Sequence, residues 1–303
     1  MRVDEVFKQA ASQGTAPVSF EMFPPKGELT LDTAREVAGN LCKLSPSFVS
    51  VTCSAGGSGN GATTAPIAHM ITSEFDTPSV AHLTCVGRSH ADIAAKIDEY
   101  RTAGVENILA LRGDLPAGAT EDDKPASDYA YARDLIPELV DAGFCVGAAA
   151  YPEGHIACED LNLSVEHLKQ KQDAGASFFV TQLFFDNERF YDFQDKCTLA
   201  GIDVPIHAGI MPILNRNQAL RLLKTCENIH LPRKFRAILD KYEHDPESLR
   251  AAGLAYAIDQ IVDLVTQDVA GVHLYTMNNA ETARHIHEAT HSLFKHHSQV
   301  SAL

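Results

Sequence analysis

The sequence predicts an α/β fold, a (β/α)8 TIM barrel in a single domain with extra helices before the last strand. Eight short runs rich in β-branched and aromatic residues are spaced along the chain, and segments with helical periodicity fill the intervals. Strands that alternate with helices indicate parallel βα units, because a parallel connection needs a long crossover. The units extend over residues 1–303 without a break in composition, which favours one closed catalytic barrel over a doubly wound open sheet.

Eight strands are expected along the chain. They are the runs at 18–23, 48–55, 80–87, 107–114, 145–152, 178–185, 204–211 and 271–277. Among the helical segments, residues 91–104 place Ile93, Ile97 and Tyr100 on one face. The segments that end at Gly143 and Gly175 each finish on a residue suited to a C-cap. The interval 216–270 has room for several helices, and 281–296 is expected to form a closing helix.

Composition indicates a cytoplasmic enzyme with an acidic surface. The chain has 303 residues, is 45% hydrophobic and carries a formal net charge of -15, so neither a nucleic acid nor an anionic membrane is an expected partner. No run approaches the ~18 apolar residues of a membrane span. Residues 1–14 lack the apolar core of a signal peptide. The seven cysteines form no CxxC pair and are expected to be reduced.

Alternation along the strands places polar side chains on one face. Successive strand residues point to opposite sides, so Ser19 and Glu21 share one face of their run, while Phe20 and Met22 share the other. In a barrel the polar face is the lumen, and active sites lie at its carboxyl-terminal mouth. The side chains expected to converge there are Glu21, Thr52, His82, Arg112, Asp114, Gln182 and Tyr275.

Glu21 stands out because it lies within an apolar run, just before Pro24 and Pro25, which end the strand. A carboxylate at such a position must be hydrogen-bonded, paired or neutral. Desolvation would favour the protonated form, which can donate a proton near neutral pH. The alternative is an internal ion pair, for which Arg112 is available. The run alone leaves both interpretations open.

Two motifs suggest nucleotides or adhesion but fit other roles better. Residues 57–62 match G-x-G-x-x-A, yet these glycines precede the helix that Thr63 and Thr64 are expected to begin, and no GK[ST] follows. A flexible active-site loop is therefore favoured over a dinucleotide fingerprint. The RGD tripeptide at 112–114 ends a buried strand. It is interpreted either as an Arg/Asp pair at the barrel mouth or as a structural salt bridge.

Some histidines and tyrosines of the sequence suit a ligand site, and others suit only a solvated surface. Tyr151 and His155 follow a strand and suit stacking and hydrogen bonding to a planar ligand. His287 and His291 stand at i, i+4, but without an HExxH arrangement they indicate a solvated helix face, and no metal is expected.

The motifs SFExxPP, LRGDxP and TQxFFD occur in this order at 19–25, 111–116 and 181–186. With further matching stretches at 48–58, 81–89, 149–155, 209–218 and 273–278, they run through nearly the whole chain. On these residues the chain resembles methylenetetrahydrofolate reductase, in the short bacterial form that is the catalytic barrel alone.

The resemblance implies an FAD-containing enzyme of one-carbon metabolism and methionine biosynthesis. Such an enzyme reduces 5,10-methylenetetrahydrofolate to 5-methyltetrahydrofolate, with electrons from NADH or NADPH by a ping-pong route, and is expected to form a homo-oligomer. The alternative is a flavin- and folate-binding subunit that receives electrons from a partner protein.

The resemblance also implies roles for particular residues. Glu21 is the general acid that assists opening of the imidazolidine ring to a 5-iminium cation, Asp114 contributes negative charge beside that cation, and Gln182 binds the pterin edge. Gln218 and Tyr275 complete the expected substrate contacts. The residues carried over for the flavin are Thr52, His82, Arg112, Gly113, Asp114, Tyr131, Ala132, Tyr151, His155, His167 and Lys171, of which Arg112 and Lys171 have the charge to meet a diphosphate.

The chain departs from the family pattern at three positions. Ser164 stands where many relatives carry aspartate, Leu222 near an aromatic that stacks on ligands in some relatives, and Asn279 in place of an arginine. These positions concern the adenosine end of FAD, the nicotinamide and the folate tail. The core of Glu21, Asp114 and Gln182 is intact.

Overall fold

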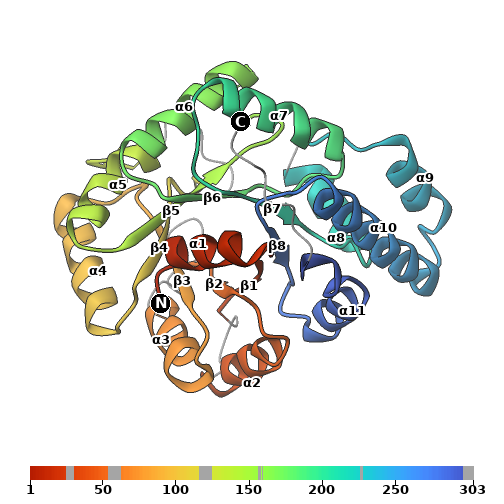
Figure 1. The fold of residues 1–303 in the computed structure, drawn as a ribbon, viewed down its shortest axis with the longest axis horizontal. Helices are drawn as coiled ribbons and strands as arrows, with labels where there is room; N and C mark the ends of the chain where they lie inside the picture. Colours follow the sequence, from red (N-terminus) through yellow and green to blue (C-terminus); the bar gives the residue numbers. More distant parts are fainter. Residues whose placement is uncertain are drawn as a thin grey trace.

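Eight parallel strands close into a barrel in the computed structural model, which describes residues 1–24, 31–53, 63–115, 125–155, 158, 160–225 and 228–295. Each strand is hydrogen-bonded to its neighbours in chain order, and β8 closes the barrel against β1. The predicted (β/α)8 barrel is thereby confirmed (Figure 1). The strands are β1 (Val18–Met22), β2 (Phe48–Val51), β3 (Ser79–Thr84), β4 (Asn107–Leu111), β5 (Cys145–Ala150), β6 (Phe178–Thr181), β7 (Ile206–Ile210) and β8 (Val272–Tyr275).

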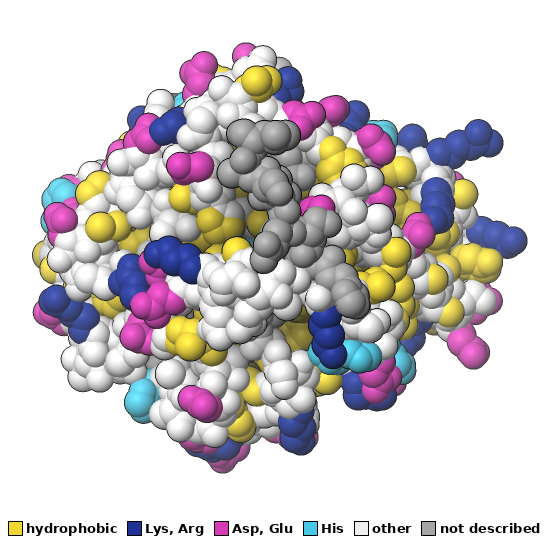
Figure 2. Space-filling model, viewed as in Figure 1, with side chains coloured by type: hydrophobic (Ala, Val, Ile, Leu, Met, Phe, Trp, Pro, Cys, Tyr) yellow, Lys and Arg dark blue, Asp and Glu magenta, His cyan; other side chains and the backbone are white. Residues whose placement is uncertain are grey.

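Helices cover the outside of this barrel, and three of them lie between β7 and β8, as the length of 216–270 predicts. In Figure 1, α9 lies at the outer edge of the molecule, and Figure 2 shows basic side chains projecting there. The surrounding helices are α2 (Leu31–Cys42), α3 (Thr64–Phe75), α4 (His90–Thr102), α5 (Ala132–Asp141), α6 (Leu161–Asp173), α7 (Asn187–Leu199), α8 (Arg216–Thr225), α9 (Arg233–Lys241), α10 (Pro246–Thr266) and α11 (Ala280–Thr290), followed by the 3-10 turn η3 (Leu293–Lys295).

The main core lies between strands and helices. The apolar phase of β1 and β2 supplies Phe20, Met22, Val49 and Val51, all buried in one cluster with helical side chains. Burying such side chains contributes about 1.5–3 kcal/mol each relative to leaving them exposed. The alternate residues of these two strands point into the lumen, as the alternation of apolar and polar residues predicts.

One further helix, α1 (Val3–Gln13), lies across the amino-terminal end of the barrel (Figure 1). Val3, Val6, Phe7 and Ala10 repeat at helical spacing and form its buried face, and Gly14 ends it at φ 64. Val3 and Phe7 pack in a second apolar cluster with lumen side chains of five strands: Phe48, Val80, Leu109, Cys145, Phe178 and Val180. Thus α1 plugs the bottom of the barrel.

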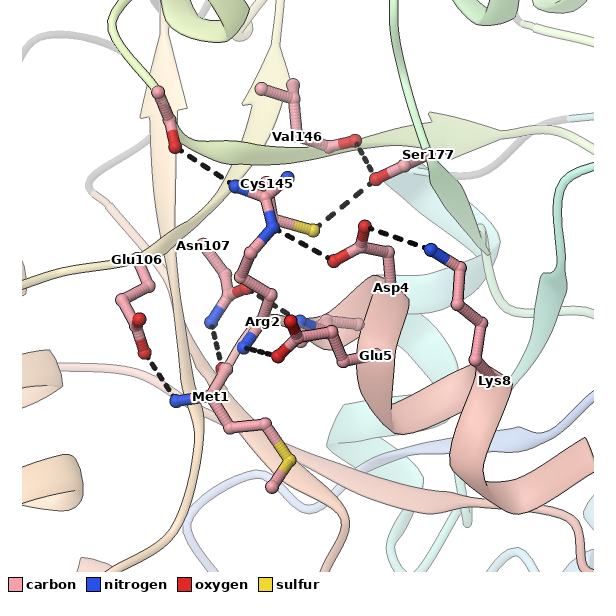
Figure 3. A network of polar contacts seen from close by, with 12 residues as sticks. Met1, Arg2, Asp4, Glu5, Lys8, Glu106, Asn107, Cys145, Val146 and Ser177 are labelled. Atoms are coloured by element: carbon pink, nitrogen blue, oxygen red, sulfur yellow. Dashed lines mark hydrogen bonds and ion pairs between the residues drawn. The ribbon is translucent and has the colours of Figure 1, made fainter. Parts of the chain in front are cut away.

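Polar contacts fix the start of this plug (Figure 3). The backbone N–H of Val3 donates to the side-chain oxygen of buried Asn107 over 2.8 Å, and the Asn107 amide donates to the carbonyl of Ser79 over 3.0 Å. The Arg2 guanidinium donates to the carbonyl of Gly143 over 3.0 Å. The helix is therefore tied to three strands or their loops at the base of the barrel.

The strand β4 differs from its expected phase. Leu109 and Leu111 line the lumen, while Ala110 packs into the outer core. Arg112 and Asp114 still reach the mouth because the strand ends at Leu111 and Gly113 turns the chain at φ 88. A Cβ on Gly113 would stand 2.9 Å from carbon atoms of Thr84 and Val86, so this turn requires glycine.

Several smaller expectations are also answered. Helix α3 begins at Thr64 with Thr63 at its N-cap, as expected, whereas the glycine-rich stretch 54–62 lies outside the described residues. None of the described helices is both long and apolar enough to span a bilayer. The described cysteines Cys42, Cys53, Cys85, Cys145, Cys158 and Cys197 are all free thiols.

Candidate active site

A cavity of about 940 Å³ opens at the carboxyl-terminal mouth of the barrel. Its walls come from the ends of β1 to β6 and β8 and from α8, so residues distant in sequence meet there because parallel strands end at one rim. The chemically informative side chains that line it are Glu21, Thr52, Cys53, His82, Thr84, Arg112, Asp114, Tyr151, His155, Gln182, Arg221 and Tyr275.

A second cavity of about 320 Å³ lies between β4, β5 and helices α5 and α6. It shares Leu111, Arg112, Ala149, Tyr151 and His155 with the first, so the two are continuous. Every residue predicted for the flavin lines one or both cavities: Thr52, His82, Gly113 and Asp114 the first, Tyr131, Ala132, His167 and Lys171 the second, and Arg112, Tyr151 and His155 both.

Glu21 points into the lumen between two imidazoles. Its Oε2 lies 3.8 Å from Nε2 of His82 and 3.9 Å from Nε2 of His273, and its side chain retains 21% exposure. The ion pairs described for Glu21 are thus with histidines of β3 and β8, in place of the Arg112 partner that the sequence made available. Partial exposure toward the cavity leaves the carboxyl group accessible to a ligand.

Both neighbours of Glu21 are deeply buried. Burial lowers the pKa of His82 to about 4; the charge of Glu21 opposes this shift, and the neighbouring His273 adds to it. His82 is therefore neutral at pH 7. Its Nε2 is buried and has no hydrogen-bond partner among the described residues.

Tyr275 of β8 forms part of the wall of the mouth cavity. Its hydroxyl donates to the carbonyl of Thr181 over 2.6 Å, and burial raises its pKa well above the ordinary value. The ring fits because β7 carries Gly209 beside it: a Cβ there would lie 2.8 Å from the ring and 2.4 Å from the Thr181 carbonyl. Tyr275 is consequently a fixed neutral donor and a rigid surface.

Asp114 and Gln182 are both exposed polar residues at the mouth. Gln182 follows the last residue of β6, and its side-chain oxygen accepts from the backbone N–H of Leu183 over 3.0 Å. This bond leaves the amide NH₂ group of Gln182 directed away from its own backbone, as a hydrogen-bond donor available to a ligand.

The second cavity contains a buried cation, Lys171, for which the described part of the chain provides no ion-pair partner. Lys171 on α6 donates to the carbonyl of Ala149 over 2.7 Å and lies 5.6 Å from the Tyr151 ring centre. Burial lowers its pKa to about 8, because removing the ammonium from water disfavours the charged form. A buried ammonium of this kind favours an anionic ligand.

Aromatic and helical groups complete the second cavity. Tyr131, 51% exposed, stacks on His167 at 6.5 Å between ring centres, with the rings 23° apart. Ala132 begins α5 and lines the cavity, so the positive end of the dipole of this helix borders the cavity. A planar group and a phosphate both find suitable partners here.

Four residues of the sequence analysis have other positions or roles. Gln218 lines neither cavity: its side chain accepts from Leu214 N–H and donates to the Pro212 carbonyl, each over 3.0 Å. Leu222 is buried with Phe235 and Tyr256 and presents no stacking surface. Asn279 caps α11 by accepting from the N–H of Thr282. Ser164 lines the second cavity.

Sequence reasoning did not single out Arg221, Met277 or Arg133. Arg221 and Met277 line the first cavity, and Arg133 lines the second, with its guanidinium 5.0 Å from the Tyr131 ring centre. The only local signal for Arg221 was a cation in the middle of a helix, α8, and many surface helices carry one there.

The sequence of the chain is similar to proteins of one known family over nearly its whole length. The family model described as methylenetetrahydrofolate reductase matches residues 6–291. The chain belongs to the methylenetetrahydrofolate reductase family. It is 37% identical over 273 residues to the 5,10-methylenetetrahydrofolate reductase of Pectobacterium carotovorum subsp. carotovorum, covering 90% of this chain and 89% of that one. The same enzyme of Escherichia coli is 36% identical, with 90% of each chain covered.

The chain is also similar to a longer protein and to a solved structure of much lower sequence identity. "Methylenetetrahydrofolate reductase (NADH) 1" of Arabidopsis thaliana is 32% identical, and the match covers 93% of this chain but 50% of that protein. Among solved structures, an uncharacterized Clostridium thermocellum protein that binds two copies of 5-methyl-5,6,7,8-tetrahydrofolic acid aligns with TM-score 0.62, over 95% of this chain and 99% of that one. At 13% identity this likeness concerns the fold.

Proposed function

We propose that this chain reduces 5,10-methylenetetrahydrofolate to 5-methyltetrahydrofolate, with FAD in the two joined cavities and NADH or NADPH as the electron donor. Family membership supports the reaction. The observation that carries the cofactor is the continuity between a mouth cavity with a carboxyl group and a side cavity with the buried ammonium of Lys171.

The residues fit FAD by their chemistry. Lys171, Arg112 and the amino-terminal end of α5 offer positive charge and N–H donors to a diphosphate. Tyr131 and His167 offer stacked rings at the side-cavity end. When bound, the flavin supplies hydride transfer between the nicotinamide and the folate, and the protein supplies orientation and electrostatics.

Glu21 acts as the general acid. Its carboxyl group lies at the floor of the mouth cavity, where it can deliver a proton to the folate nitrogen that leaves when the imidazolidine ring opens. Neutral His82 beside it adds no positive charge that would oppose the cationic substrate. Asp114 contributes negative charge on the other side of the cavity, and Gln182 and Tyr275 orient the pterin.

Spectroscopy of the purified protein tests this function. A yellow protein is expected, with flavin absorbance that bleaches anaerobically on addition of NADH or NADPH and returns when methylenetetrahydrofolate is added. A protein that stays colourless after reconstitution with FAD contradicts the proposal.

A second candidate is a flavin- and folate-binding subunit that receives electrons from a partner protein. The burial of Leu222 favours it, because no aromatic side chain is presented at that position to stack on a nicotinamide. Stopped-flow mixing of the isolated protein with each nicotinamide separates the candidates. Rapid bleaching supports the first, and bleaching only after addition of an electron-transfer protein supports the second.

A further inference from the structure

Below Glu21, a continuous chain of polar side chains crosses the interior of the barrel. Ser19 Oγ lies 2.7 Å from Nδ1 of His273 and 3.1 Å from Nδ1 of His207, and Ser50 Oγ lies 3.3 Å from Nε2 of His273. All four residues are buried, none with more than 2% exposure. They come from β1, β2, β7 and β8, and three of these strands, β1, β2 and β8, also end in or next to residues of the mouth cavity.

His207 is held in one orientation by its surroundings. Phe7 of α1 meets the ring edge-on at 4.6 Å and Phe48 stacks on it at 5.4 Å. Gly271 provides the space, since a Cβ there would lie 2.2 Å from Nε2 of His207. Burial lowers the pKa of His207 well below its ordinary value, so the ring is neutral and carries one proton.

The position of this proton on the His207 ring follows from the hydrogen-bond partners of its two nitrogens. Nε2 of His207 is buried and has no hydrogen-bond partner among the residues that the structure describes. A proton there would leave a buried donor unsatisfied, at a cost of about 1–3 kcal/mol. On Nδ1 it can donate to Ser19, and the 3.1 Å separation suits an N–H···O bond. The favoured tautomer of His207 is therefore Nδ1–H.

The next bond in the chain runs from Ser19 to His273. Its length of 2.7 Å is typical of a hydroxyl donor. The other acceptor within reach of Ser19, the carbonyl of Val272, is 3.5 Å away and can form only a weak bond. Ser19 thus accepts from His207 and donates to Nδ1 of His273, which leaves the His273 proton on Nε2. That N–H faces Ser50 and the Glu21 carboxyl group.

We propose that Ser19 and His207 are positioning residues that hold His273 as its Nε2–H tautomer and so direct a polar N–H toward Glu21, whose Oε2 lies 3.9 Å from Nε2. The proposal rests on the role of Glu21 in the proposed function. After Glu21 has delivered its proton, the His273 N–H stabilises the resulting carboxylate. The other titratable or charged groups around Glu21 are His82 on β3, Tyr275 on β8, and the further side chains of this kind that line the mouth cavity, which are Cys53, Arg112, Asp114, Tyr151, His155 and Arg221.

Nuclear magnetic resonance of ¹⁵N-histidine-labelled protein tests the tautomers without requiring activity. Single His→Gln variants assign the ring signals. We expect a protonated Nδ1 and an unprotonated Nε2 for His207, and the reverse for His273. A protonated Nε2 in His207, or a protonated Nδ1 in neutral His273, overturns the proposal. Because no flavin or folate is involved, this result stands whether or not the proposed function survives.

Rapid kinetics tests the consequence. In Ser19→Ala the carboxylate of Glu21 loses the support of an oriented donor, so Glu21 should retain its proton to higher pH. The alkaline limb of the folate half-reaction should therefore move up by about one pH unit, with no change in the pH profile of flavin reduction. Ser19→Thr retains the hydroxyl and should restore the parent profile.

Ser12→Ala, which removes an exposed hydroxyl on α1 that bonds only the local Gln9 carbonyl, is the matched control and should match the parent. If Ser19→Ala leaves the alkaline limb unmoved, or slows both half-reactions equally, Ser19 does not act through Glu21.

Discussion

Glu21 and the imidazoles on either side of it concentrate the chemistry of the mouth into one small region. The carboxyl group is accessible from the cavity but is backed by buried, neutral His82. Such an arrangement allows a proton to leave toward the ligand while solvent reaches the acid from one side only.

Glu21→Gln should leave reduction of the flavin by nicotinamide within about twofold of the parent and slow folate reduction at least 100-fold, since an amide cannot serve as the acid. Single-turnover stopped-flow of each half-reaction measures both rates. Glu36→Gln, an exposed substitution on α2, is the control. Equal losses in the two half-reactions would show that Glu21 is not a proton donor.

Lys171→Met should weaken FAD binding about 10- to 100-fold, because a buried ammonium that meets a diphosphate contributes more than an exposed one. The Lys171 pKa of about 8 adds a pH dependence: in the parent, FAD affinity should decline as pH rises through 8 and the ammonium loses its proton. Flavin fluorescence titration at several pH values measures this.

Lys169→Met on the same helix is the control, since Lys169 pairs with Asp173 on the outer surface. An FAD affinity of Lys171→Met equal to that of this control would exclude contact with the diphosphate.

At the scale of elements, the loop after β5 is tied to the segment before α9. The backbone N–H of His230 lies 3.1 and 3.2 Å from the two Glu153 carboxylate oxygens, and the Asn228 amide donates to the Gly154 carbonyl over 2.6 Å. The tied loop also carries Tyr151 and His155, which line both cavities. Movement of this tie would move both ligand surfaces.

This tie should depend on pH. Burial raises the pKa of Glu153 to about 7, against the His230 N–H and Arg189, which lower it. The folded state thus holds the proton more tightly than the unfolded chain, so stability contributed by neutral Glu153 is lost as pH rises from about 4.5 to 7. Glu153→Gln should match the parent in melting temperature at pH 5 and exceed it at pH 8. A difference that is constant with pH would contradict this.

The elements show where sequence reasoning succeeds. All eight strands were expected from their β-rich runs, but each was extended beyond its carboxyl end, as with 178–185 against Phe178–Thr181. The hydrogen-bonded ladder between neighbouring strands ends where the strands move apart at the mouth of the barrel. The β-propensity of the residues does not show where a strand loses its hydrogen-bonded neighbours. The phase of β4 was wrong because Leu109 and Leu111 fill the lumen beneath the mouth, where apolar packing prevails over polar alternation.

The candidate site was predictable to the extent that family motifs cover it. Glu21 and Gln182 lie at strand ends within such motifs, and both face the cavity. Gln218 lies within a matching stretch but is used to brace its own loop. His207 was not singled out because its role depends on pairing between β1, β7 and β8, which the local sequence does not contain.

At the scale of the whole molecule, α1 joins the outer layer to the lumen. Its apolar face was not predicted as a helix, although Val3, Val6, Phe7 and Ala10 carry the spacing. Phe7 packs on both Phe178 and His207 and so connects the plug to the polar chain beneath Glu21. The expected homo-oligomer stays a prediction.

Phe7→Ala should destabilise the fold by about 3 kcal/mol, the typical cost of a large-to-small change in a core. Urea denaturation followed by circular dichroism measures the difference. Leu199→Ala, at a side chain that is 88% exposed, is the control and should change stability by less than about 0.5 kcal/mol. A Phe7 variant as stable as this control would show that α1 is dispensable for the barrel.

The plug formed by α1 also affects the order in which reactants bind and products leave. With α1 and its apolar cluster filling the amino-terminal end, reactants have to reach the floor of the mouth cavity through the opening at the opposite end. The product of one half-reaction must therefore leave the cavity before the next reactant can bind there. Each reactant in excess should then delay the other, so that a surplus of folate slows the step that consumes nicotinamide.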